Sequence, residues 1–126
     1  HMPLLESTRH FVNAETIARM KDGVTIINCA RGELMNIPDM IRGIETQKIG
    51  ALALDVFDKE DGIYHENRRD DILSNRDMAY LRQFPNVIMT QHMAFYTDAA
   101  VQSMVFCGIE GLCDFAKTGH TATELV

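Results

Sequence analysis

Short apolar runs alternate with longer amphipathic stretches along the chain. Three runs, at 24–28, 51–54 and 87–89, are rich in valine, isoleucine, leucine and alanine and have the length of buried strands. The stretches between them carry apolar residues at helical spacing and begin with residues that cap helices. The pattern therefore predicts strands and helices in alternation.

The first amphipathic stretch predicts a helix that begins after Asn13. Asparagine is a favoured N-cap residue, and Glu15 places negative charge in the first turn, where the helix dipole favours it. Val12 and Ile17 have the spacing of a hydrophobic staple. We expect Lys21 in the last turn of this helix, which glycine 23 then ends.

Two further helices are predicted before the third strand. Asn36 is the expected N-cap of the first, and Pro38 lies in its first turn, where the missing N–H has no cost. A short helix is expected over 77–83. The polar stretch 58–71 is dense in charge and predicts a surface loop.

The last helix is predicted to begin at Thr97 and Asp98 and to end at Gly119. Its apolar residues recur at helical spacing and form one stripe, made of Val101, Met104, Val105, Ile109, Leu112, Cys113 and Ala116. A stripe of this kind needs a partner to cover it. In isolation, the helix would expose it to solvent.

The predicted strands are apolar throughout rather than alternating, and helices separate them. This combination is typical of a parallel sheet that helices cover on both faces. We therefore expect an α/β fold.

Composition and charge narrow the class of protein. The chain has 126 residues, 46% hydrophobic and 24% charged, which is ordinary for a soluble domain with a core. The formal net charge of −6 disfavours a nucleic-acid binder. Neither a stretch of about 20 apolar residues nor a secretory leader is found, so no membrane association is expected.

The three cysteines are an odd number, and their spacing contains no CxxC pair. A disulfide framework and a thiolate zinc site are therefore disfavoured, and no metal site is expected. We expect three reduced, mostly buried thiols in a cytoplasmic protein.

Polar residues that could carry chemistry follow each predicted strand. Arg31 follows the first strand, Asp55 ends the second with Glu60 five residues later, and His92 follows the third. Ligands of open parallel sheets bind beyond the carboxyl ends of the strands. Topology alone leaves two alternatives equally open. These residues either form one shared site, or they follow the strands by chance, because loops are generally polar.

This set of groups suits one half of a 2-oxo acid reduction. An arginine offers paired N–H donors to a carboxylate, and a histidine can exchange a proton near neutral pH. The other half needs a hydride donor. The eight glycines contain no G-x-G pair, so the chain either binds no dinucleotide or lacks the glycine-rich half of such a fold.

Several motifs in register resemble the C-terminal portion of NAD-dependent D-2-hydroxyacid dehydrogenases of the D-lactate dehydrogenase type. The segments that carry the resemblance are His1-Met2-Pro3-Leu4, Met20-Lys21-Asp22-Gly23, Asn28-Cys29-Ala30-Arg31-Gly32, Ala53-Leu54-Asp55-Val56 and Thr90-Gln91-His92-Met93-Ala94-Phe95-Tyr96-Thr97.

The resemblance implies catalytic roles for three residues. Arg31 would hold the substrate carboxylate and polarise the carbonyl oxygen. His92 would donate the proton in reduction and accept it in oxidation. Glu60 would pair with His92 and keep the ring protonated.

The resemblance also implies a binding site for the cofactor NAD, to which Arg31 belongs as well. Asp55, with the backbone of Cys29 and Ala30, would position the nicotinamide. The path of the cofactor would be lined by Met2, Pro3 and Thr8. Phe95 and Tyr96 would help to shape the substrate pocket.

The expected fold is the C-terminal part of a Rossmann-like nucleotide-binding domain, over residues 1–94. Residues 95–126 would form a C-terminal helix and tail that belong to a substrate domain absent from this chain. The family implies a homodimer formed through the absent half of the nucleotide-binding domain. Its substrates would be 2-oxo acids, giving products such as D-lactate, 2-hydroxyisocaproate or 2-hydroxyglutarate.

Two alternatives remain open from the sequence. One is a non-catalytic interaction protein on the same fold, like the dehydrogenase-like corepressors. The other is an inactive, truncated gene product. The choice between NAD and NADP is also open, because the residue beside the ribose 2′ position is absent.

Overall fold

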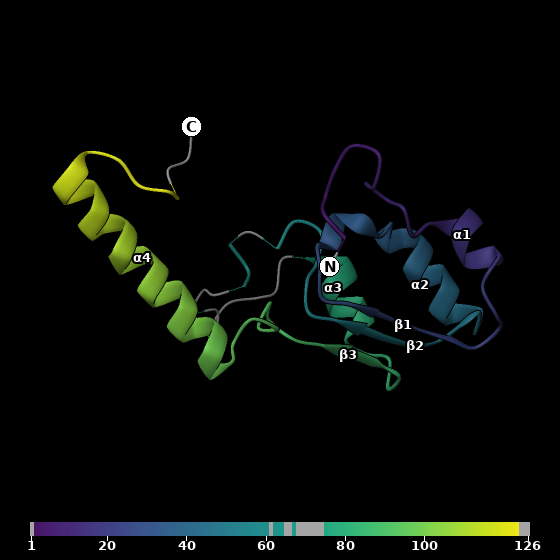
Figure 1. The fold of residues 1–126 in the computed structure, drawn as a ribbon. Helices are drawn as coiled ribbons and strands as arrows, with labels where there is room; N and C mark the ends of the chain where they lie inside the picture. Colours follow the sequence, from purple (N-terminus) through teal and green to yellow (C-terminus); the bar gives the residue numbers. More distant parts are fainter. Residues whose placement is uncertain (1, 61, 65–66, 68–74, 124–126) are drawn as a thin grey trace. The chain divides into compact units, whose positions relative to one another are not determined.

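The computed structural model describes residues 2–60, 62–64, 67 and 75–123 (Figure 1). The chain divides into two compact units, His1–Met93 and Ala94–Val126, which are described separately. The predicted surface loop over 58–71 lies in part outside the described residues.

The first unit contains a three-stranded parallel sheet in the order β1-β2-β3. Its strands are β1 (Val24–Asn28), β2 (Ile49–Leu54) and β3 (Val87–Met89). The predicted α/β class is confirmed. The second strand begins two residues earlier than predicted because Ile49, which is fully buried, pairs with β1.

The helices of the first unit are α1 (Ala14–Ala18), α2 (Ile37–Glu45) and α3 (Arg76–Leu81), with a short 3₁₀ helix at Gly32–Leu34. Each α-helix begins at an asparagine whose side chain accepts hydrogen bonds from backbone N–H groups of the first turn. The predicted caps at Asn13 and Asn36 are confirmed.

The prediction for Lys21 is wrong, because α1 ends at Ala18 and Lys21 lies beyond the helix. The physical reason is a contact distant in sequence. Lys48 Nζ donates to Met20 O (2.6 Å) and lies 2.7 Å from Asp22 Oδ1, and this holds the connection to β1 in a turn. Gly23 then enters the strand at a φ of 73°.

The core lies between the sheet and its helices. Leu52 and Leu54 of β2 are buried against α2 and α3. Their helical partners in the same cluster are Ile17, Ile37, Met40, Ile44, Met78 and Leu81.

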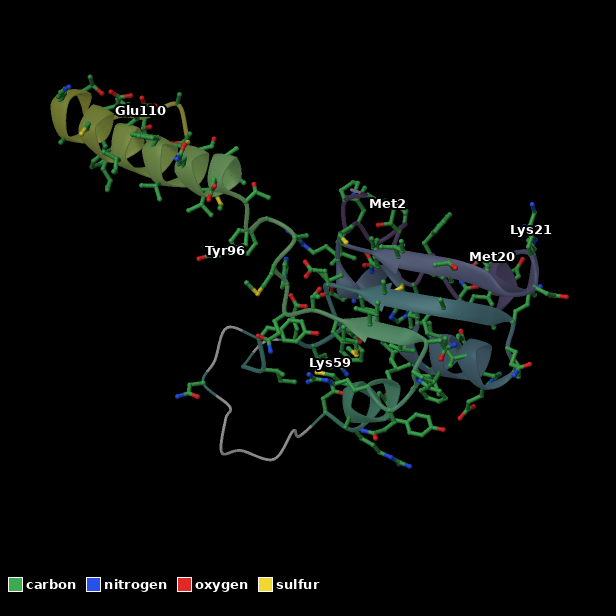
Figure 2. All side chains as sticks on the ribbon, turned by 90° about the horizontal axis from the view of Figure 1, so that it is seen from below. Met2, Met20, Lys21, Lys59, Tyr96 and Glu110 are labelled. Atoms are coloured by element: carbon green, nitrogen blue, oxygen red, sulfur yellow. The ribbon has the colours of Figure 1, made fainter. Side chains whose placement is uncertain are left out.

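The opposite face of the sheet is open, so the prediction of two covered faces is wrong for the part of this unit that the structure describes. Ile27, Ala53 and Ile88 lie side by side across the three strands. Ile27 is 69% exposed and Ile88 is 65% exposed. In Figure 2 the strands lie in front of α2 and α3, which pack against the far face.

The second unit is dominated by α4 (Asp98–Thr118). The Thr97 side chain accepts from the Ala100 N–H, and Gly119 ends the helix in the left-handed conformation, as predicted. None of the α4 residues is buried, so its apolar stripe is exposed.

By length and composition, α4 could cross a membrane, which corrects the expectation that no segment is apolar enough. Glu110 and Asp114 lie within the helix. A charged side chain near the centre of a bilayer costs about 2.5–3.5 kcal/mol. The core helix of a soluble protein meets the same criterion, so α4 is weak evidence for a membrane span.

The expectation of buried thiols is also wrong. Cys29, Cys107 and Cys113 are all exposed. Cys29 lies in the loop after β1, beyond the end of the sheet. Cys107 and Cys113 lie on α4, where no residue is buried.

Candidate active site

The loop after β1 is shaped by a buried asparagine. Asn28, 8% exposed, donates from Nδ2 to the Arg31 carbonyl (2.8 Å) and accepts at Oδ1 from the Ala30 N–H (3.0 Å). This turn leaves the Arg31 side chain exposed, with its guanidinium 2.7 Å from the Ala30 carbonyl. The arginine is thus anchored at its backbone and accessible at its donors.

Five of the seven predicted cofactor-binding residues line one cavity of about 440 Å³ beside this loop. Its lining consists of Met2, Pro3, Leu4, Cys29, Ala30 and Arg31. The other two, Thr8 and Asp55, are not among the lining residues. Asp55 is described with His92 below. The Thr8 hydroxyl donates to the Pro3 carbonyl (2.8 Å) and accepts from the Leu5 N–H (2.8 Å), so it fixes the segment that forms one wall.

The loops after β1 and β2 meet closely. The Asp55 N–H donates to the Asn28 carbonyl (3.0 Å), which continues the sheet pairing into the loops. Gly32 lies against the backbone of Phe57 and Asp58, where any added Cβ would overlap main-chain atoms. The glycine therefore lets the Arg31 loop approach the loop that leads to Glu60.

Gly32→Ala is expected to destabilise the protein by about 1–3 kcal/mol, because neither backbone segment can yield locally. Denaturant unfolding of the full-length protein measures this change. Gly108→Ala on α4 is the matched control, since nothing lies within 4 Å of its added Cβ. Helix propensity predicts that this control is neutral or stabilising by up to about 1 kcal/mol. Equal stability of the two variants would contradict the close approach at Gly32.

Glu60 and His92 form an ion pair between Glu60 Oε1 and His92 Nδ1. The other carboxylate oxygen, Oε2, accepts from the Phe57 N–H (2.7 Å), which fixes the glutamate in its loop. The side chains are 30% exposed for His92 and 21% for Glu60. A histidine held at Nδ1 by a carboxylate has a fixed ring orientation and can exchange a proton through Nε2.

Asp55 is hydrogen-bonded to the backbone of His92 and is 5% exposed. Its Oδ1 accepts from the Thr90 hydroxyl (2.5 Å) and from the Met93 N–H (2.8 Å), and its carbonyl accepts from the His92 N–H (2.6 Å). The structure therefore brings Asp55 to the loop that carries His92. Its predicted contact with the nicotinamide stays a prediction.

Tyr64 is close enough to these carboxylates to be affected by them. Burial raises its pKa, Glu60 and Asp55 raise it further, and Arg82 opposes them. The phenol is therefore neutral at physiological pH and can remain beside the carboxylates without adding negative charge.

Phe95 and Tyr96 belong to the second unit, on the segment that leads into α4. Tyr96 is labelled in Figure 2. The two rings meet edge to face with centroids 6.1 Å apart. Tyr96 also lines a cavity of about 170 Å³ with Thr97 and residues of the first turns of α4. Their role in a substrate pocket stays a prediction.

Sequence reasoning missed Asn28 and Thr90. Both stand at the carboxyl ends of predicted strands, and parallel pairing of Leu54 with Met89 brings Thr90 beside Asp55. The signal that could have identified them is a polar residue at the last position of a strand, as for Asn28, or directly after it, as for Thr90.

The sequence and the fold of this chain match one known protein family. The profile of the family described as "D-isomer specific 2-hydroxyacid dehydrogenase, NAD binding domain" matches residues 1–94. The chain belongs to this family, and its fold is part of the Rossmann-like fold of those enzymes.

Relatives extend the similarity over the whole chain. The chain is 42% identical over 126 residues to an aromatic 2-oxoacid reductase of Clostridium sporogenes and 38% identical to a D-2-hydroxyacid dehydrogenase (NAD(+)) of Clostridioides difficile. Each alignment covers all of this chain and 38% of the relative's length.

A solved structure agrees with these relatives. The crystal structure of a D-lactate dehydrogenase from Treponema pallidum matches 100% of this chain, with a TM-score of 0.93 and 32% identity. The chain covers 38% of that protein. The sequence-based recognition of the family is thus confirmed.

Proposed function

We propose that this chain forms part of an NAD-dependent D-2-hydroxyacid dehydrogenase, which reduces a 2-oxo acid with NADH. The observation that carries the proposal is the pairing of Glu60 with His92 at one sheet edge, where the loop of Arg31 also lies. Arg31 supplies a binding group for a carboxylate, and His92 supplies a proton donor whose orientation Glu60 fixes.

Arg31 binds the substrate carboxylate in this proposal. Its guanidinium is exposed and lines the cavity, and its planar donors match the two oxygens of a carboxylate. The positive charge also polarises the adjacent carbonyl, because developing negative charge on the carbonyl oxygen is stabilised by a nearby cation.

His92 donates the proton to the carbonyl oxygen during reduction. Because Nδ1 contacts Glu60, Nε2 is the nitrogen that faces the substrate and transfers the proton. In oxidation the neutral ring accepts the same proton. Glu60 stabilises the imidazolium and keeps the ring from rotating.

The residues around the 440 Å³ cavity fit one end of a nicotinamide cofactor. Met2 and Pro3 offer an apolar wall, Cys29 and Ala30 bring backbone close to the cavity, and Thr8 fixes the wall segment. Asp55 would help to position the nicotinamide. When bound, NADH supplies the hydride for the carbonyl carbon.

The substrate class is open among small and aromatic 2-oxo acids. Relatives include an aromatic 2-oxoacid reductase and D-lactate dehydrogenases, so pyruvate and phenylpyruvate are both reasonable substrates. Products such as D-lactate, 2-hydroxyisocaproate and 2-hydroxyglutarate define the range to be tested.

The full-length protein that carries this sequence is expected to oxidise NADH with at least one 2-oxo acid. The measurement is NADH absorbance with pyruvate, 2-oxoisocaproate, phenylpyruvate and 2-oxoglutarate, and the ranking of kcat/KM names the substrate. A folded protein that turns over none of them would contradict the proposal and favour an interaction protein on the same fold.

We further propose a cytoplasmic homodimer in which residues 95–126 belong to the substrate domain. The three free thiols support a reducing compartment, and the exposed stripe of α4 supports a partner for that helix. Light scattering of the full-length protein tests the dimer.

A further inference from the structure

Thr90 has no direct role in the proposed chemistry, but its hydroxyl is bonded to Asp55, which is proposed to position the nicotinamide. Thr90 directly follows β3, and its N–H continues the sheet by donating to the Leu54 carbonyl (2.9 Å). Its hydroxyl donates to Asp55 Oδ1 at 2.5 Å. A threonine is thus linked to a buried carboxylate 35 residues away in the sequence.

Asp55 in turn holds the backbone on both sides of the catalytic histidine. Its carbonyl accepts from the His92 N–H (2.6 Å), and its Oδ1 accepts from the Met93 N–H (2.8 Å). The Thr90 hydroxyl meets the same Oδ1, so residues 90–93 bend around this one aspartate.

His92 needs such support because its backbone is in the left-handed region, with a φ of 54°. This conformation costs an L-residue about 1–2 kcal/mol and persists only where surrounding contacts hold it. If the support loosens, the backbone can relax and move the imidazole away from Glu60.

We propose that Thr90 is a positioning residue that acts through Asp55 on His92. The Thr90 hydroxyl fixes the Asp55 carboxylate, the carboxylate fixes the left-handed turn, and the turn presents the imidazole to Glu60. The catalytic consequence rests on the proposed function, because it concerns proton donation to a 2-oxo acid.

Thr90→Val keeps the shape of the side chain and removes its hydroxyl. Without that donor, the buried Asp55 carboxylate loses a hydrogen bond and can shift. A small misplacement of a reacting group can cost up to about 10²-fold in rate, so we expect kcat to fall by about 10- to 100-fold. The Tm should fall modestly, because one hydrogen bond to a buried carboxylate is lost.

Two variants separate the hydroxyl from other effects. Thr90→Ser restores the donor and should recover most of kcat. Thr46→Val makes the same change at an exposed helix end, where the lost bond goes to the Arg42 carbonyl, and should leave kcat unchanged. A Thr90→Ser variant as slow as Thr90→Val would overturn the proposal.

A double-mutant cycle tests whether Thr90 acts through His92. In a His92→Gln background, Thr90→Val should produce no further loss of kcat, because the proton donor is already gone. Additive losses would show that Thr90 contributes independently of His92 and would overturn the proposal.

Imidazole ¹⁵N NMR of His92 supplies a readout that does not need turnover. Thr90→Val should shift the Nδ1 signal toward that of a histidine without a carboxylate partner, and Thr90→Ser should not. If the wild-type protein reduces no 2-oxo acid, the proposed function fails, yet this shift still supports the positioning role. An unchanged Nδ1 signal in Thr90→Val overturns that role whether or not the protein is active.

Discussion

His92→Gln is expected to lower kcat by about 10²–10⁴-fold, the range that a positioned general acid contributes. Glutamine can still hydrogen-bond to Glu60, but it cannot transfer a proton to the substrate oxygen. Because the lost interaction forms during the reaction, NADH affinity should change little. Steady-state kinetics and fluorescence titration with NADH measure the two quantities in the full-length protein.

His10→Gln is the control for this substitution. His10 lines a different cavity, together with Asn36, Asp58 and Lys59, and neither Glu60 nor His92 is among the residues that line it. The control should keep kcat within about twofold of wild type, as expected for a side chain outside the site. A His92→Gln variant that retains wild-type kcat would remove His92 from the mechanism.

Arg31→Gln is expected to lower kcat/KM by about 10²–10⁴-fold. Two charge-assisted hydrogen bonds to a carboxylate contribute about 1.5–3 kcal/mol each, and each 1.36 kcal/mol corresponds to a tenfold change in rate. Both KM and kcat should worsen, because the contact exists in the bound substrate and continues into the transition state. Initial rates over a range of 2-oxo acid concentrations give both constants.

Two further variants test the reason for this loss. Arg31→Lys keeps the charge but not the paired planar donors, so it should recover only a small part of the activity. Arg19→Gln removes an exposed arginine that pairs with Glu15 on α1 and should leave the kinetics unchanged. If Arg31→Gln left kcat and KM intact, the substrate anchor would have to be another residue.

The helix starts and the strands were predictable because the interactions that define them are local. An asparagine cap bonds to N–H groups two or three residues further on, so Asn13 and Asn36 identify their helices without any tertiary information. The end of α1 was not predictable in this way. It depends on Lys48, in the turn between α2 and β2, whose ammonium group contacts Met20 and Asp22.

The open face of the sheet shows the limit of hydrophobic patterning. Ile26 and Ile27 are adjacent and chemically identical, yet Ile26 packs toward the core and Ile27 is 69% exposed. A strand that is apolar on both sides carries no period-two signal, so the sequence cannot tell which side this chain covers. Burial on each side depends on which elements pack there.

The sequence by itself determined the class of fold, the caps of the helices and the residue types available at the ends of the strands. Tertiary structure alone decided which of these residues meet. Glu60 pairs with His92, and Asp55 accepts hydrogen bonds from Thr90 and Met93. These contacts join positions more than 30 residues apart in the sequence. Such contacts arise because parallel strands bring their carboxyl ends to one edge, and their geometry depends on strand register, which no local pattern encodes.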